Sequence, residues 1–184
     1  GTNVLMNMSN EIGGLPTRNA QATMFDHADD IGGETVTDTI LVGNPTCHAC
    51  PVACKKEVEI TEGPYKGLHM ESVEYESAWA LGADCGIGDL DDVAELVRLC
   101  NEYGLDTISC GATIAWAMDC FEAGLLSEAD TGGLSLRFGD HQAMTAMVEQ
   151  IAFRRGFGDT LAEGSARAAD IIGRGTQERV VTCK

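Results

Sequence analysis

The placement of proline is the feature of this sequence that most constrains its fold. All four prolines lie within the first 64 of 184 residues, and the rest of the chain contains none. Proline breaks a helix interior because it lacks a backbone N–H donor and clashes with the preceding turn. Its absence therefore permits long helices from about Asp89 onward, in a chain long enough for one domain, or two at most.

Apolar residues repeat at helical spacing through this proline-free part. In the segment 89–103, Val93, Leu96 and Val97 stand at i, i+3 and i+4, the pattern of a helix with one buried face. Further helices are predicted over 107–123, 140–155 and 159–172, with aspartates as N-caps and glycines as stops. Helices joined by short connectors predict an all-α fold, a multi-helical array or bundle.

The first third of the chain is expected to be loop-rich. The segment 10–19 contains two glycines and a proline and reads as a loop. The run 34–42 is rich in Thr, Val and Ile and is the one convincing strand. We therefore expect a single helical domain over residues 1–184, with a loop-rich part over 1–70 and helices over 71–184.

The charge balance excludes several partners. There are 29 acidic and 12 basic side chains, which gives a formal net charge of −17. Binding to nucleic acid or to an anionic membrane needs lysines and arginines, so neither partner is expected. No apolar run is long enough to span a bilayer. The start carries no secretory signal, so we expect a cytoplasmic location, and both ends read as cuts from a longer protein.

Three cysteines are spaced as metal ligands. Cys47, Cys50 and Cys54 form a C-x2-C-x3-C pattern with Pro51 after the second cysteine. On a helix these positions share one face, and Pro51 suits a first helical turn. Three thiolates on one face can hold an iron–sulfur cluster when a fourth ligand comes from elsewhere.

Other interpretations of the motif remain open. Zinc with His48 as a ligand is one alternative, and a disulfide is another, although nothing indicates an oxidising compartment. Cys183 is a candidate fourth ligand within the chain. The remaining cysteines are expected to be small core residues, as free cysteine commonly is: Cys85, Cys100, Cys110 and Cys120.

Six segments follow one another along the chain: 10–19 (NEIGGLPTRN), 47–54 (CHACPVAC), 74–77 (EYES), 80–82 (ALG), 99–112 (LCNEYGLDTISCGA) and 151–164 (IAFRRGFGDTLAEG). In this order they resemble the motifs of the aldehyde:ferredoxin oxidoreductases, which are tungsten-pterin enzymes. The resemblance spans nearly the whole chain. It implies the first helical, middle domain of a longer protein that also has an N-terminal β-rich domain and a later helical domain.

The resemblance implies roles for individual residues. Cys47, Cys50 and Cys54 match three of the four ligands of a [4Fe–4S] cluster, and the fourth family cysteine lies beyond Lys184, which argues against Cys183. The family's pterin-binding motif corresponds to Asn101, Gly104, Leu105 and Asp106. Asn101 stands where the family has an aspartate, so this position can accept and donate a hydrogen bond but brings no charge.

Glu76 matches a family carboxylate near the metal that is proposed to carry a proton. Oxidation of an aldehyde needs a proton acceptor, and a carboxylate in a dry pocket has a pKa raised toward neutrality. The alternative is that Glu71, Glu74 and Glu76 form a solvated acidic run.

The resemblance implies a complete reaction for the whole protein. Tungsten, or molybdenum, on a bis-pterin takes two electrons from an aldehyde and yields a carboxylic acid, and the cluster passes the electrons to ferredoxin. The implied partners are ferredoxin, the aldehyde, the missing domains and a second copy in a homodimer. The chain alone is expected to be inactive. The competing hypothesis is a non-enzymatic iron–sulfur electron carrier or structural metal domain, which needs a fourth ligand such as Cys183 or Cys85.

Overall fold

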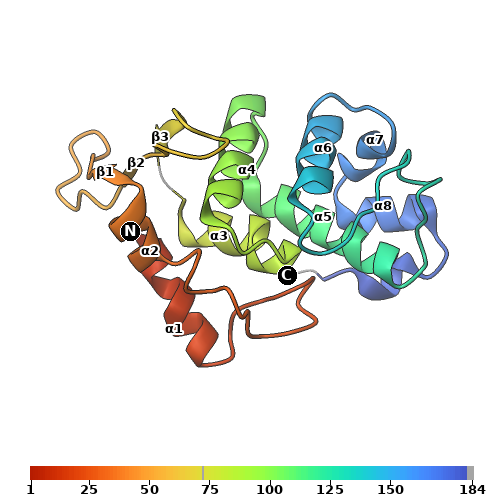
Figure 1. The fold of residues 1–184 in the computed structure, drawn as a ribbon. Helices are drawn as coiled ribbons and strands as arrows, with labels where there is room; N and C mark the ends of the chain where they lie inside the picture. The colour runs from red at the N-terminus through yellow and green to blue at the C-terminus, as the bar shows by residue number, and fades with distance from the viewer. Residues whose placement is uncertain (72, 182–184) are drawn as a thin grey trace.

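A computed structural model describes residues 1–71 and 73–181 of the chain. Figure 1 shows a small sheet with α1 and α2 on one side of the molecule, α3 and α4 in the middle, and α5 to α8 on the other side. The helices are α1 (Leu5–Glu11), α2 (Gly33–Thr39), α3 (Tyr75–Leu81), α4 (Leu90–Tyr103), α5 (Thr107–Glu122), α6 (His141–Ala152), α7 (Phe157–Leu161) and α8 (Ser165–Ile172), with 3-10 turns η1 (Thr2–Val4), η2 (Ala83–Cys85) and η3 (Thr176–Arg179).

The expectation of an all-α fold is wrong, because the described part of the chain contains a three-stranded antiparallel sheet. Its strands are β1 (Leu41–Gly43), β2 (Glu57–Glu59) and β3 (His69–Glu71), in the order β1-β2-β3. Val58 in the central strand pairs with Leu41 and Met70. Each strand has three residues, too few for the alternation that reveals a strand in a sequence. The fold is mixed α/β.

The predicted strand over 34–42 is mostly a helix. The segment forms α2 up to Thr39, and β1 begins only at Leu41. The threonine hydroxyls are satisfied within the helix, since Thr37 donates to the Gly33 carbonyl at 2.8 Å and Thr39 donates to the Thr35 carbonyl at 2.6 Å. Tertiary packing of the buried Val36 thus overrides the strand propensity of the threonines.

Three of the predicted helices in the later part of the chain are confirmed as α4, α5 and α6. Each begins behind an aspartate whose carboxylate accepts backbone N–H bonds: Asp89 from Asp91 and Asp92, Asp106 from Ser109, and Asp140 from Ala143. None of the helices within the described ranges is long and apolar enough to cross a membrane.

The helix predicted over 159–172 is instead two short helices. α7 ends at Leu161 and α8 begins at Ser165. Gly164 between them has a φ of 84°, which a continuous right-handed helix does not allow. Asp159 lies inside α7 and does not cap it.

The hydrophobic core is built around α5. Ile114, Trp116 and Met118 on this helix are fully buried. The Trp116 indole donates to the carbonyl of Thr176 at 3.1 Å, which satisfies its polar N–H inside the core.

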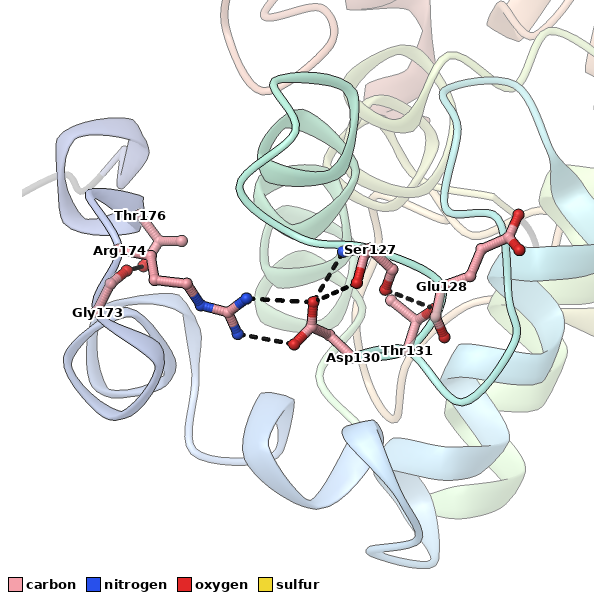
Figure 2. A network of polar contacts seen from close by, with 7 residues as sticks. All are labelled: Ser127, Glu128, Asp130, Thr131, Gly173, Arg174 and Thr176. Atoms are coloured by element: carbon pink, nitrogen blue, oxygen red, sulfur yellow. Dashed lines mark hydrogen bonds and ion pairs between the residues drawn. The ribbon is translucent and has the colours of Figure 1, made fainter.

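An ion pair joins the loop after α5 to the segment after α8 (Figure 2). The Arg174 guanidinium donates to both carboxylate oxygens of Asp130, at 2.7 and 3.3 Å. Ser127 donates to the same carboxylate through its backbone N–H at 2.9 Å and its hydroxyl at 2.7 Å. These donors, Arg174 first, hold the pKa of Asp130 well below its usual range.

Candidate functional site

The three cysteines of the C-x2-C-x3-C pattern lie on the loop 44–56 between β1 and β2. The loop has no helix, so the predicted helical start at Pro51 is wrong. Ala49 and Ala53 have φ values of 55° and 49°, left-handed conformations that a right-handed helix excludes. The backbone N–H of Cys50 donates to the Cys47 carbonyl at 3.0 Å, which closes the C-x2-C segment into a turn.

The loop presents its thiols outward. Cys47 and Cys54 are exposed and Cys50 is half-buried. Lys55 next to them donates to Glu71 at 2.6 Å. The pKa of Lys55 is raised first by that hydrogen bond and further by the nearby charges of Cys47 and Cys54. The predicted positive charge beside the thiols is therefore in place.

The donor set has the right chemistry for an iron–sulfur cluster, because thiolates are the ligands that such clusters use. Across residues 1–71 and 73–181, however, no three His, Cys, Asp or Glu side chains lie in a metal-holding arrangement. Four other cysteines are buried, as expected: Cys85, Cys100, Cys110 and Cys120. Cys183 lies outside the described residues.

Gly1 lies between the end of the loop and the start of α3. A Cβ built on Gly1 would stand 3.1 Å from the Cys54 carbonyl oxygen and 3.3 Å from a carboxylate oxygen of Glu74. Glu74 is the N-cap residue of α3. The Thr2 hydroxyl donates to Glu74 at 2.6 Å and accepts the backbone N–H of Tyr75 at 3.0 Å, so a residue from η1 caps this helix.

The acidic run from 71 to 76 is divided among different environments. Glu71 pairs with Lys55, and Glu74 accepts from Thr2. Glu76 lies in the first turn of α3, is exposed, and has no hydrogen-bond or ion-pair partner among the described residues. Glu76 is thus the one carboxylate of this run that is available to a ligand, and the dry pocket expected around it is not formed by these residues.

The predicted pterin motif forms the corner between α4 and α5. Gly104 ends α4 with a φ of 69°, and the Leu105 N–H donates to the Cys100 carbonyl at 2.8 Å. Asp106 caps α5 by accepting the Ser109 N–H at 2.7 Å, and this bond lowers the pKa of the Asp106 carboxyl. The corner and Asn101 are exposed, except that Leu105 is half-buried.

A small cavity lies beside this corner. Its volume is about 130 Å³, and its walls include Leu105, Asp106, Cys110 and Ile151. Ligand pockets usually measure about 300–1,000 Å³, so this hollow alone is too small for a pterin.

The structure places the start of α3, which carries Glu76, beside the start of α5, which follows the 101–106 corner. The Ser77 hydroxyl on α3 and the Thr107 hydroxyl on α5 form a hydrogen bond of 2.8 Å. Glu76 and Asp106 each precede one of these residues, so their Cα atoms lie within about 15 Å of each other. Sequence reasoning missed Thr2, Ser77 and Thr107, because only contacts between distant segments give them a role.

The sequence profile of the family described as "Aldehyde ferredoxin oxidoreductase, domains 2 & 3" matches residues 1–184. The chain belongs to this family. It is 43% identical over 179 residues to the tungsten-containing aldehyde ferredoxin oxidoreductase of Thermococcus kodakarensis, and 42% identical over 179 residues to that of Pyrococcus furiosus. Each match covers 94% of this chain and 28% of the relative, so the chain spans about a quarter of these relatives' length.

A solved structure shares the fold. The chain superimposes on part of the active-site complex BamBC of benzoyl coenzyme A reductase with a TM-score of 0.73 and 23% sequence identity. The match covers 96% of this chain and 27% of the other. At this identity the likeness concerns the fold, including its mixed α/β character.

Proposed function

We propose that this chain is one domain of a longer tungsten-pterin, [4Fe–4S] oxidoreductase that oxidises aldehydes to carboxylic acids with ferredoxin as electron acceptor. Membership of the family and the names of the relatives support this proposal. The observation that carries it is the hydrogen bond between Ser77 and Thr107, which holds the start of α3, with Glu76, beside the start of α5, with Asp106. We place the enzyme in the cytoplasm and allow for a homodimer.

In this proposal the cysteine loop supplies three cluster ligands. Cys47, Cys50 and Cys54 would hold the cluster through their thiolates, and a cysteine elsewhere in the full protein would be the fourth ligand. Cys47 and Cys54 are exposed and therefore accessible to iron. Lys55 offsets part of the negative charge of the thiolates.

The α4–α5 corner forms part of the wall against the pterin. Asn101 offers an amide that both donates and accepts hydrogen bonds, while Asp106 stays charged at neutral pH. The cofactor, with tungsten or molybdenum, supplies the two-electron chemistry when bound. Because the cavity here is only about 130 Å³, other parts of the full protein complete the pocket.

Glu76 is the proposed proton acceptor for aldehyde oxidation. It is unpartnered among the described residues and stands on the first turn of α3, beside the hydroxyl bridge to α5. The remaining domains of the full protein would cover it and exclude water from around it, as transfer of a proton from the substrate requires.

Metal analysis of the full-length protein tests the proposal. We expect tungsten or molybdenum and about four iron atoms per chain. Cys47→Ser should lower the iron content and abolish electron transfer to ferredoxin, whereas Cys120→Ser, a buried thiol far from the loop in sequence, should retain both. Zinc as the only metal, or full ferredoxin-linked turnover in the Cys47→Ser variant, would contradict the proposal.

The structure weakens the electron-carrier hypothesis in one respect. Cys85, one of its two candidate fourth ligands, is fully buried, and its thiol donates to the carbonyls of Ala80 and Gly111. It therefore lies inside the helix packing, where its thiol is not accessible to a cluster held by the exposed loop.

A further inference from the structure

The starts of α3 and α5 are joined by a hydroxyl pair. The Ser77 and Thr107 oxygens are 2.8 Å apart, and the bond is partly buried. Each hydroxyl follows directly after a residue of the proposed site, Glu76 on α3 and Asp106 on α5. A shift of either helix start would therefore move a site residue and break this bond.

One turn further along, the two helices are in direct backbone contact. A Cβ built on Gly111 would stand 2.4 Å from the Ala80 carbonyl oxygen and 2.6 Å from its carbon. Only glycine permits this approach, so α5 lies closer to α3 than ordinary side chains allow. The contact fixes the distance between the helices but leaves rotation about the crossing point open.

Cys85 connects this crossing to the segment before α6. Its thiol lies 3.3 Å from the Ala80 carbonyl oxygen and 3.4 Å from the Gly111 carbonyl oxygen, so it can donate to both helices. Its own carbonyl accepts the backbone N–H of Gly139 at 2.9 Å. The Ser77–Thr107 bond is then a second point of attachment between the helices, displaced from the crossing toward the site.

We propose that Ser77 and Thr107 are positioning residues that hold Glu76 at a fixed distance and orientation from the 101–106 corner. Two points of attachment, the Ala80–Gly111 crossing and the hydroxyl bond, stop the helices from rotating against each other. The inference rests on the proposed function for its catalytic consequence. Small misplacements of a catalytic group cost a large part of its rate, so the bond should matter for turnover more than for binding.

Amide hydrogen exchange of the full-length protein tests the positioning directly. Thr107→Val keeps the shape of the side chain and removes the hydroxyl, and we expect the N–H groups of Leu105 and Ser109 to exchange about tenfold faster. Thr107→Ser keeps the hydroxyl and should restore the wild-type rates. Unchanged exchange in Thr107→Val would overturn the proposal.

Thr131→Val is the matched control. Thr131 is fully buried in the loop after α5 (Figure 2), and its hydroxyl donates to the Leu134 carbonyl at 2.5 Å, with the Glu128 carbonyl at 3.2 Å as a second acceptor. The same loss of a hydroxyl there should lower stability and leave the exchange of Leu105 and Ser109 unchanged. Equal acceleration in both variants would mean that general destabilisation explains the effect, which would overturn the proposal.

Turnover separates this inference from the proposed function. Glu76→Gln, which tests the proton acceptor, should slow aldehyde oxidation with metal content intact. Ser77→Ala and Thr107→Val should each lower kcat about tenfold with little change in KM, and the double variant should lose no more than either alone. Thr107→Ser should recover kcat.

The outcomes are distinguishable. If Glu76→Gln slows turnover but the hydroxyl variants behave like Thr131→Val, the positioning role is wrong and the proposed function stands. If Glu76→Gln has no effect, the proposed role of Glu76 is wrong, and the exchange rates alone then decide whether the bond positions the two helix starts.

Discussion

At the scale of single residues, the most unusual group outside the site is the buried carboxylate of Asp84 in η2. It is 4% exposed and accepts the backbone N–H of Ala20 at 3.1 Å. Ala20 belongs to a turn in which Arg18, Asn19 and Ala20 all have left-handed φ values between 52° and 55°. Burial raises the pKa of Asp84 to about 6, and the hydrogen bonds from Ala20 and Asn19 offset only part of this effect.

The raised pKa makes stability depend on pH. Folded Asp84 binds its proton more tightly than unfolded Asp84, so its contribution is fully present below about pH 4 and is lost as the pH rises through about 6. The Asp84→Asn variant should not lose stability in this way, because asparagine does not ionise. In urea titrations, the free energy of unfolding of the variant relative to wild type should rise by roughly 2–3 kcal/mol between pH 4 and pH 7. Asp38→Asn, at an exposed carboxylate, should show no such trend.

Residue-level features were predictable where the cause is local. The caps Asp89, Asp106 and the stop at Gly104 follow from contacts within a few residues, and the sequence predicts all three. The burial of Asp84 and the capping of α3 by Thr2 depend on contacts between distant segments, so no local sequence pattern predicts them. The roles of Cys47, Asn101 and Glu76 remain predictions.

At the scale of elements, α3 and α5 approach each other closely enough for backbone contact beside the proposed site. It depends on Gly111, whose Cβ position is occupied by the Ala80 carbonyl. Glycine inside a helix normally costs about 1 kcal/mol relative to alanine, so its presence at this position reflects packing.

Gly111→Ala should therefore destabilise the protein although alanine favours helix. Because the clash at 2.4 Å involves backbone atoms that cannot move away cheaply, we expect a loss of about 3 kcal/mol in the free energy of unfolding. The urea midpoint measures this loss. Gly14→Ala, where the nearest atoms are 3.6 Å away, is the control and should be tolerated. A stable Gly111→Ala variant would show that the helices can separate without cost.

The predictability of elements follows their length. α4, α5 and α6 have long periodic patterns and were predicted nearly to their ends. The three-residue strands and the short helix α3 carry too few residues for a periodic signal. The threonines of α2 predict a strand where the structure has a helix. The helical start predicted at Pro51 is wrong because the spacing of the cysteines defines one face only if the segment is already a helix.

At the scale of the whole molecule, charge is the dominant feature. Acidic residues exceed basic ones by 17, and several of the basic side chains are paired, such as Arg174 with Asp130. The remaining excess of negative charge repels itself across the surface and opposes the compact state.

Salt should therefore stabilise the protein. Because the screening length shrinks from about 10 Å at 0.1 M to about 3 Å at 1 M, the repulsion largely disappears at molar KCl. We expect Tm to rise by about 3 °C or more, which at this chain length corresponds to roughly 1 kcal/mol. Sucrose at equal osmolality is the control for exclusion of the solute. A Tm that stays constant or falls with KCl would show that the surface ion pairs outweigh the repulsion.

The cap that Thr2 provides for α3 also sets an order of folding. The hydrogen bond from Thr2 to Glu74 spans 72 residues, so it forms only after a long loop has closed, whereas Asp106 caps α5 from three residues away. The α4–α5 corner should therefore acquire structure early in refolding, and the first turn of α3 late. Pulse-labelled hydrogen exchange should show protection at Ser109 before Tyr75. The part of the protein that carries Glu76 would then be the last of the proposed site to take shape.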